Sequence, residues 1–308
     1  MKKKKLIVIT GPTATGKTAA AVEIAKRMDG EIVSADSMQI YDVLSIGTAR
    51  PTADEMQGIP HHLVGFVDPS EKYSAGKFQK DALECIENIS ERGKQPILVG
   101  GTGLYINAVT YDMDFSAPER DAEKSSRYLK LYNEEGPDAA YGLLKKKDPD
   151  AAARIHKNDR MRVVRALEVA DSPPDTGYDF RRPSERYDFR IFALTKDRAR
   201  LYSDIEKRVD IMFERGLEKE VRELRERYGD DIQAFQAIGY KEFIPYFNGE
   251  IDIDKVRELI KRNTRRYAKR QLTWLRPDSR VNWIYTDRVS CAADEICDII
   301  RKIDEQGG

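Results

Sequence analysis

The sequence is poor in the residues that build disulfides and metal sites. Its 308 residues include only three cysteines and three histidines. Cys85, Cys291 and Cys297 form no CxxC pair, and their spacing to the histidines does not match a metal site. This usage argues against a disulfide-stabilised secreted protein and fits a reducing intracellular compartment.

A net charge of either sign and a long apolar run are also missing. Lys and Arg together number 53, as do Asp and Glu, so the formal net charge is zero. The total charge therefore neither favours nor excludes a nucleic-acid partner, and only local clusters can decide. The apolar run Leu6–Thr10 is too short for a membrane span or a signal peptide. We expect a cytoplasmic protein with no membrane partner, and a monomer by default.

Short apolar runs alternate with helical patterns in the first hundred residues. Strands are expected at Leu6–Thr10, Glu31–Ala35 and Pro96–Val99. A helical pattern at Thr18–Met28 follows the first of these strands, and another at Phe78–Arg92 precedes the third. This alternation predicts an α/β fold with a parallel sheet flanked by helices on both faces.

The pattern changes near Asp114, where strand signals stop. Residues 121 to about 171 are rich in Ala, Leu, Lys and Glu, and the polar stretch Asp171–Arg186 contains three prolines. We therefore predict two domains: a catalytic core of residues 1–114 and 187–308, and a mostly helical insertion of residues 115–186.

After the insertion, the chain returns to the sheet with a strand at Phe189–Leu194, and a last strand is expected at Trp283–Tyr285. The remainder reads as helical. Helices are predicted at Arg198–Gly216, Leu217–Tyr228, Ala234–Tyr246, Asp254–Trp274 and Cys291–Ile303.

The segment Gly11–Thr18, GPTATGKT, matches the phosphate-loop pattern GxxxxGK[ST] and lies between a predicted strand and a predicted helix. In such a loop, backbone amides and the helix N-terminus surround a phosphate. Lys17 would reach the outer phosphate oxygens, and the Thr18 hydroxyl would bind Mg²⁺. The pattern by itself does not distinguish nucleotide hydrolysis, kinase chemistry and diphosphate binding.

Two further strands end in residues that suit a ligand site. Asp36 follows the second predicted strand, where the carboxyl ends of parallel strands line a crevice, so it is placed to hold Mg²⁺ or to accept a proton. The third strand runs into Gly100–Gly103, GGTG, and then into another predicted helix. No acidic residue follows this strand, which weakens a hydrolase interpretation. Small residues there allow a ligand to approach the backbone closely, and Thr102 could hydrogen-bond to it.

These blocks and several others resemble the tRNA dimethylallyltransferase (tRNA isopentenyltransferase) family, in order over nearly the whole chain. The matching segments are GPTATGKT (Gly11–Thr18), ADSMQIY (Ala35–Tyr41), GTARP (Gly47–Pro51), PHHLVG (Pro60–Gly65), GGTGLY (Gly100–Tyr105), DPDAAARIHKNDRMRVVRALEV (Asp148–Val169), RVDIMFERGLEKEV (Arg208–Val221), QAIGYKE (Gln236–Glu242) and TRRYAKRQLTW (Thr264–Trp274). No C-terminal zinc-finger extension of the eukaryotic type is visible, so the resemblance is to the bacterial type.

The resemblance implies transfer of a dimethylallyl group from dimethylallyl diphosphate to N6 of the adenosine at tRNA position 37, with Mg²⁺ and without ATP consumption. It implies that Asp36 is the general base and that Thr102 lies near the reacting amine. Lys17 would stabilise the leaving diphosphate. The diphosphate-binding residues would be Gly11, Pro12, Thr13, Ala14, Thr15, Gly16, Lys17, Thr18 and Arg208.

The same resemblance implies a tRNA surface that receives the anticodon stem-loop. A basic run at Lys261–Arg270 places Arg262, Arg266 and Lys269 on one helix face, which suits phosphate contacts. The expected tRNA-contacting residues are Asp36, Ser37, Met38, Gln39, Thr102, Arg127, Asp159, Arg160, Met161, Arg162, Val163, Gln236, Gly239, Tyr240, Lys241, Arg266 and Lys269.

Three other functions stay open. A related enzyme could prenylate free adenine nucleotides, but it would not need the insertion. A small-molecule kinase using ATP would share the phosphate loop. A tRNA-binding module without catalysis is disfavoured by the intact Lys17, Thr18 and Asp36. The sequence departs from the family at Lys157, where proline is common after the histidine, and in the stretch Asp171–Arg186, to which we assign no function.

Overall fold

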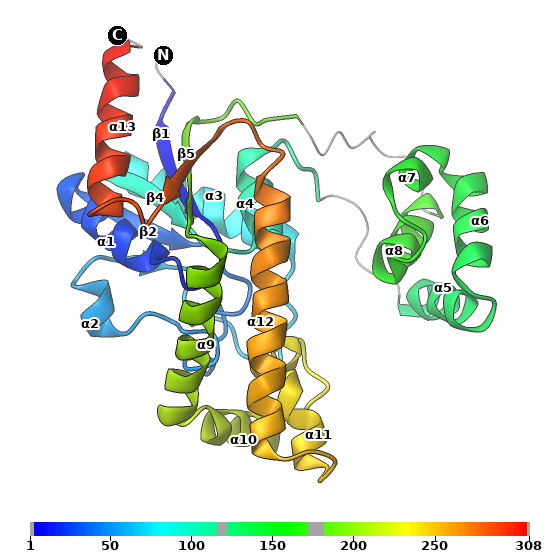
Figure 1. Ribbon diagram of the computed structural model, residues 1–308. Coiled ribbons are helices and arrows are strands. Elements are labelled where there is room, and N and C mark those ends of the chain that lie inside the picture. The colour runs from blue at the N-terminus through cyan, green and yellow to red at the C-terminus, as the bar shows by residue number, and fades with distance from the viewer. Residues whose placement is uncertain (1–2, 116–121, 172–181, 307–308) are drawn as a thin grey trace. The chain divides into compact units, whose positions relative to one another are not determined.

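The computed structural model describes residues 3–115, 122–171 and 182–306 (Figure 1). The chain forms two compact units, Met1–Asp112 with Arg181–Gly308 and Met113–Phe180, and each is described by itself. Most of the stretch Asp171–Arg186, for which the sequence predicted a polar loop, lies outside the described residues.

The first unit is built on a six-stranded sheet whose strands are all parallel. The strand order is β3-β2-β4-β1-β5-β6. The strands are β1 (Lys5–Thr10), β2 (Gly30–Ser34), β3 (His61–His62), β4 (Gln95–Val99), β5 (Asp188–Thr195) and β6 (Val281–Tyr285). Every predicted strand is present, and the predicted parallel α/β fold is confirmed.

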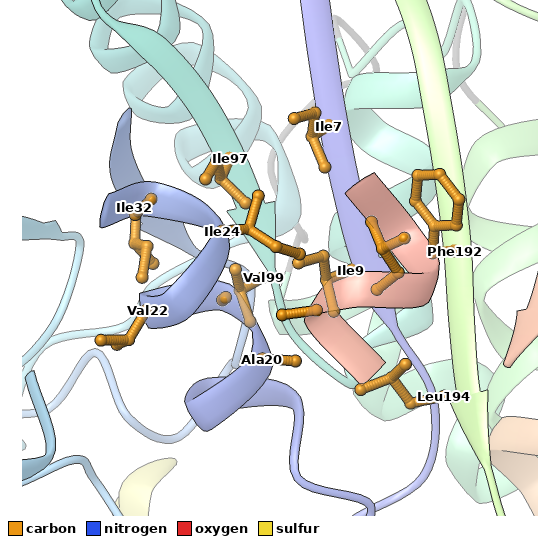
Figure 2. Packing of buried hydrophobic residues seen from close by; sticks show 14 of the residues in the cluster. Ile7, Ile9, Ala20, Val22, Ile24, Ile32, Ile97, Val99, Phe192 and Leu194 are labelled. Atoms are coloured by element: carbon orange, nitrogen blue, oxygen red, sulfur yellow. The ribbon is translucent and has the colours of Figure 1, made fainter. Parts of the chain in front are cut away.

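Helices cover both faces of this sheet because the central strands are apolar on both sides. Figure 2 shows Ile7, Ile9, Ile97 and Val99 packed with Ile24 and its neighbours on α1 (Lys17–Arg27), a cluster that α13 (Ala292–Gln306) also joins. Alternate residues such as Leu6 and Val8 are also fully buried, so the opposite face is covered as well. The core helices are α1, α2 (Ala53–Met56), α3 (Ala75–Glu91), α4 (Gly103–Thr110), α9 (Arg198–Glu214), α10 (Leu217–Tyr228), α11 (Ile244–Phe247), α12 (Ile253–Leu275) and α13.

One predicted helix of the core is wrong. The segment Ala234–Tyr246 forms two short 3₁₀ turns, η1 (Ala234–Gln236) and η2 (Lys241–Phe243), followed by α11. Gly239 breaks the helix with a φ of 100°, and its amide donates to the buried Glu242 side chain at 2.8 Å. A local hydrogen bond to a side chain replaces the helical ladder at this point.

The second unit is mostly helical over its described residues 122–171, as the sequence predicted. It contains α5 (Ala122–Glu134), α6 (Pro137–Lys147), α7 (Pro149–Arg154) and α8 (Arg160–Ala170). Asp148 and Asp159 cap α7 and α8, each accepting a hydrogen bond from a backbone amide of the first turn. The unit has its own core, which includes the fully buried Leu144, Val163 and Leu167. Across all described residues, no helix combines the length and the apolar character that a membrane span requires.

Candidate active site

The phosphate loop joins β1 to α1 and is closed by its own hydrogen bonds. Thr15 Oγ1 donates to the Pro12 carbonyl at 2.9 Å, and Lys17 Nζ donates to the same oxygen at 2.8 Å. Gly11 has a φ of 127°, and a Cβ there would lie 2.2 Å from the backbone oxygen of Leu194, so only glycine fits. No side chain caps the N-terminus of α1, which leaves its first amides for an anionic ligand.

Two cations stand beside this loop without a carboxylate partner. Burial and the nearby charge of Arg208 lower the pKa of Lys17 to about 8, while Asp36 opposes the shift. Burial also lowers the pKa of the Arg208 guanidinium on α9, which Asp36 again opposes. Within the described part of the chain, neither cation has a carboxylate at ion-pair distance. A multiply charged anion such as a diphosphate is therefore the ligand that this pair fits.

Asp36 follows β2 and is held by the turn that it begins. Its Oδ1 accepts hydrogen bonds from the backbone amides of Met38 at 3.0 Å and Gln39 at 3.3 Å. Among residues 3–115, 122–171 and 182–306, Oδ2 has no hydrogen-bond partner. One oxygen thus fixes the carboxylate, and the other is available to accept a proton or to contact a cation.

Thr102 lies at the start of α4 and is joined to the residue after Asp36. Its Oγ1 accepts from the Ser37 amide at 3.0 Å and donates to Ser37 Oγ at 3.2 Å. The charge of Asp36 acts on Lys17, Arg208 and Tyr267. The structure therefore brings Asp36, Thr102, Lys17 and Arg208 together, although they are spread over nearly two hundred residues of sequence.

Two residues of α12, Tyr267 and Gln271, also belong to this site, although no sequence motif assigned them a role. Burial and the charge of Asp36 raise the pKa of Tyr267 to about 12, while hydrogen bonds with Thr102 and Gln271 oppose the shift. Gln271 is only 6% exposed. A signal was present in the sequence, because Gln271 stands in the apolar stripe of this helix with Ala268 and Leu275, where an unpaired amide would be costly.

The loop that follows Asp36 is anchored by the carboxylate of Glu220 on α10. That carboxylate accepts hydrogen bonds from the amides of Ser45 at 3.1 Å, Ile46 at 2.7 Å and Gly47 at 3.0 Å. It also accepts from Ser45 Oγ and from the Tyr240 hydroxyl, both at 2.6 Å. Five donors on one side chain fix this loop as part of the folded core.

The anchored loop in turn fixes Gln39. Its Nε2 donates to the carbonyls of Thr48 at 3.1 Å and Ala49 at 3.2 Å. Because both partners are acceptors, the amide must present its NH₂ group to them, which leaves Oε1 as the group free for a ligand. Asp36, Ser37, Met38 and Gln39 are all partly exposed, as a ligand-contacting segment requires.

The remaining residues expected to contact tRNA divide into exposed and buried ones. In the core unit, Gln236, Lys241, Arg266 and Lys269 are exposed, and in the second unit Arg127, Arg160, Met161 and Arg162 are exposed. Tyr240 and Val163 have no exposed surface, since Tyr240 binds Glu220 and Val163 packs in the helical core. Gly239 is buried as well, and Asp159 caps α8. Contact of Tyr240 and Val163 with RNA stays a prediction, and since both side chains are buried it would have to involve their backbone.

The basic run on α12 is only partly available to a ligand. Lys261 pairs with Asp210 at 2.7 Å, and Arg265 pairs with Glu206 at 2.6 Å. In contrast, Arg262, Arg266 and Lys269 are exposed and have no ion pair within the described ranges. The predicted stripe, together with the exposed Arg270, is the part of the run that can contact phosphates.

The site fits Mg²⁺ only as an ion held mainly by substrate. No group of three or more His, Cys, Asp or Glu side chains among the described residues could hold a metal by itself. Mg²⁺ usually keeps several waters and binds through one or two protein oxygens plus substrate phosphates. The Thr18 hydroxyl, at the second residue of α1, matches such a limited donor set.

A phosphate-loop motif after β1, two cations that have no carboxylate at ion-pair distance among the described residues, and a carboxylate after β2 are features that suit an enzyme of the phosphate-loop class. A sequence model of the IPP transferase family matches residues 39–278, and the chain belongs to that family. The family expected from the sequence is thereby confirmed, as is the assignment to the prenyltransferases.

Proteins similar in sequence and structure match this chain over nearly its whole length. The chain is 47% identical over 290 residues to a tRNA dimethylallyltransferase of Exiguobacterium sp., covering 94% of this chain and 93% of the relative. The tRNA isopentenylpyrophosphate transferase from Bacillus halodurans has a TM-score of 0.73 at 43% identity, with coverage of 98% and 96%. A eukaryotic dimethylallyltransferase, described as acting on tRNA, has a TM-score of 0.81 at 30% identity, with coverage of 98% of this chain and 80% of the other.

Proposed function

We propose that this protein transfers the dimethylallyl group of dimethylallyl diphosphate to N6 of adenosine 37 in tRNA and releases diphosphate. The observation that carries the proposal is the pair Lys17 and Arg208 beside the phosphate loop: among the described residues neither forms an ion pair with a carboxylate, although the charge of Asp36 acts on both. The similarity to proteins named tRNA dimethylallyltransferase supports the same reaction.

The chemistry follows from the charges on each side of the site. Lys17, Arg208 and the uncapped amides of α1 stabilise the negative charge that develops on the diphosphate as the allylic carbon–oxygen bond breaks. The N6 lone pair then forms the new bond to that carbon, and the free Oδ2 of Asp36 takes the N6 proton. Mg²⁺, held by the phosphates and Thr18, would supply further charge neutralisation.

The acceptor is proposed to enter as a nucleotide flipped out of the anticodon loop, which is least costly for an unpaired base. Arg266 and Lys269 in the core, and Arg127, Arg160 and Arg162 in the insertion of residues 115–186, would bind the phosphates of the anticodon stem-loop. Residues 1–114 and 187–308 would form the catalytic core. We also propose a cytoplasmic monomer.

The identity of the molecule that accepts the prenyl group distinguishes this function from the alternative functions. The test uses the full-length protein with Mg²⁺, radiolabelled dimethylallyl diphosphate and unmodified tRNA that has adenosine at position 37, with AMP and ATP as competitors. Label retained in tRNA supports the proposal, whereas label in AMP would identify an enzyme acting on free nucleotides. Hydrolysis of ATP or movement of its phosphate, without prenyl transfer, would identify a kinase-like enzyme. Binding of tRNA with no reaction would identify a module without catalysis.

Binding of diphosphate should take up protons near pH 8. The pKa of Lys17 is about 8 in the free protein, so about half of the side chains are neutral at that pH, and the anion's charge raises the pKa on binding. We expect an uptake of up to about half a proton, and weaker diphosphate binding as the pH rises above about 8. Calorimetry in two buffers with different ionisation enthalpies measures this uptake.

The matched control is Lys17→Arg, whose guanidinium stays protonated throughout. Proton exchange by the diphosphate itself is common to both proteins, so the difference between them isolates Lys17. Equal uptake by the two proteins would mean that Lys17 is already fully charged before binding.

A further inference from the structure

The side chain of Gln271 on α12 connects two loops that are far apart in sequence. Its Oε1 accepts from the Thr13 amide of the phosphate loop at 3.3 Å, and its Nε2 donates to the Gly101 carbonyl at 2.7 Å. Thr13 lies on the side of the site proposed for the donor, and Gly101 directly precedes Thr102 on the side proposed for the acceptor. A single amide therefore spans the two halves of the site.

The hydrogen-bonding groups of the two loops restrict which side chain can bridge them from position 271. Thr13 offers a donor and Gly101 an acceptor, so the bridging side chain must provide an acceptor and a donor in one planar group, as a primary amide does. The fit is also tight, because a Cβ on residue 101 would lie 2.3 Å from Gln271 Nε2. Among the residues described by the structure, no direct hydrogen bond joins residues 11–16 to residues 100–103.

Tyr267 extends the bridge by one helical turn. Its hydroxyl interacts with the side chains of Thr102 and Gln271, which lower its pKa against the larger effect of burial, and Thr102 binds both the amide and the hydroxyl of Ser37. A continuous chain of contacts thus runs from the phosphate loop through Gln271 and Thr102 to the residue beside Asp36.

We propose that Gln271 is a positioning residue that holds the phosphate loop at a fixed separation from Thr102 and Asp36. The inference rests on the proposed function, in which the leaving diphosphate is bound on one side of this bridge and the reacting amine on the other. Transfer requires the allylic carbon and N6 to approach in line, and a misplacement of about 1 Å can lower a rate about 100-fold. Loss of the bridge should therefore slow the reaction more than it weakens either binding step.

The first test compares Gln271→Leu with the wild type and with Thr273→Val as a control. Leucine removes both hydrogen bonds with little change in volume, whereas Thr273 is exposed on the same helix and its hydroxyl donates to the Lys269 carbonyl of that helix. We expect Gln271→Leu to lower the single-turnover rate of label transfer to tRNA about 100-fold. Its affinities for Mg²⁺-diphosphate and for an anticodon stem-loop should change by less than about threefold. Thr273→Val should match the wild type.

A second variant, Gln271→Glu, keeps the test valid if the leucine variant folds poorly. A carboxylate can accept from Thr13 but cannot donate to Gly101, whereas a protonated carboxyl group can do both. Its single-turnover rate, relative to wild type at each pH, should therefore rise as the pH falls and the carboxyl group becomes protonated. A role in folding alone would not produce this relative rise.

Four outcomes would overturn the inference, and the last of them would overturn the proposed function as well. Transfer by Gln271→Leu within threefold of wild type would show that the bridge is not needed, and a loss explained fully by weaker binding would make Gln271 a binding residue. A pH-independent ratio for Gln271→Glu would contradict the hydrogen-bond argument. If the wild type itself transfers no label, the proposed function fails and this inference fails with it.

Discussion

Replacing Asp36 with asparagine is expected to lower the single-turnover rate of prenyl transfer to tRNA by about 10²- to 10⁴-fold. The asparagine oxygen can still accept the hydrogen bonds that Met38 and Gln39 donate to Asp36, so the turn after β2 is retained. What is lost is the basic oxygen that takes the N6 proton. The rate is measured with enzyme in excess over tRNA and with saturating donor.

The matched control for this variant is Asp42→Asn, which removes the same charge from an exposed residue of the same loop. It should transfer at the wild-type rate. Affinity of Asp36→Asn for the anticodon stem-loop should change little. A rate within tenfold of wild type would show that another group or water takes the proton.

Removing either cation beside the phosphate loop should lower the single-turnover rate about as much as the Asp36→Asn substitution does. Lys17→Met and Arg208→Met are each expected to lower the single-turnover rate about 10²- to 10³-fold, the size found for losing one group that stabilises developing negative charge. Both cations lack a carboxylate partner among the described residues, so each variant removes a charge without leaving an unpaired carboxylate behind. Both variants should fold, because the burial of these charges is itself unfavourable.

The double variant distinguishes a shared ligand from two independent effects. If Lys17 and Arg208 act on the same diphosphate, the combined loss should be smaller than the product of the two single losses. Lys207→Met is the control, since Lys207 is exposed and precedes Arg208 on α9. Independent, multiplicative losses would separate the role of Arg208 from the diphosphate.

Much of the core could be predicted because its signals are local. The strand, loop and helix of Leu6–Met28 are contiguous, and the central strands are apolar runs that only a sheet covered on both faces can bury. The two elements not predicted, α2 and β3, are four and two residues long. β3 is too short to show a period, whereas α2 begins with a capping box at Thr52 and Glu55 that the sequence contains.

The helix predicted at Ala234–Tyr246 fails for a local reason, whereas the burial of Tyr240 and Val163 follows from tertiary packing. The segment Ala234–Tyr246 looks helical, but Gly239 and the buried Glu242 form a side-chain hydrogen bond that ends the helix. Tyr240 and Val163 fall in blocks that suggested an RNA surface, yet both are needed to fill a core and have no exposed area. A sequence motif alone does not show which of its residues are buried in the core and which are exposed at the surface.

The sequence by itself determined the phosphate loop, the parallel α/β core, the helical insertion and the family, because each is expressed by residues close together in the chain. Only the tertiary structure decided which distant side chains complete the site. Gln271 meets the Thr13 amide across 258 positions, and Glu220 meets the loop at Ser45 across 175. Such contacts depend on how helices α10 and α12 pack against the other helices of the core, and no local pattern of hydrophobicity or propensity specifies that packing.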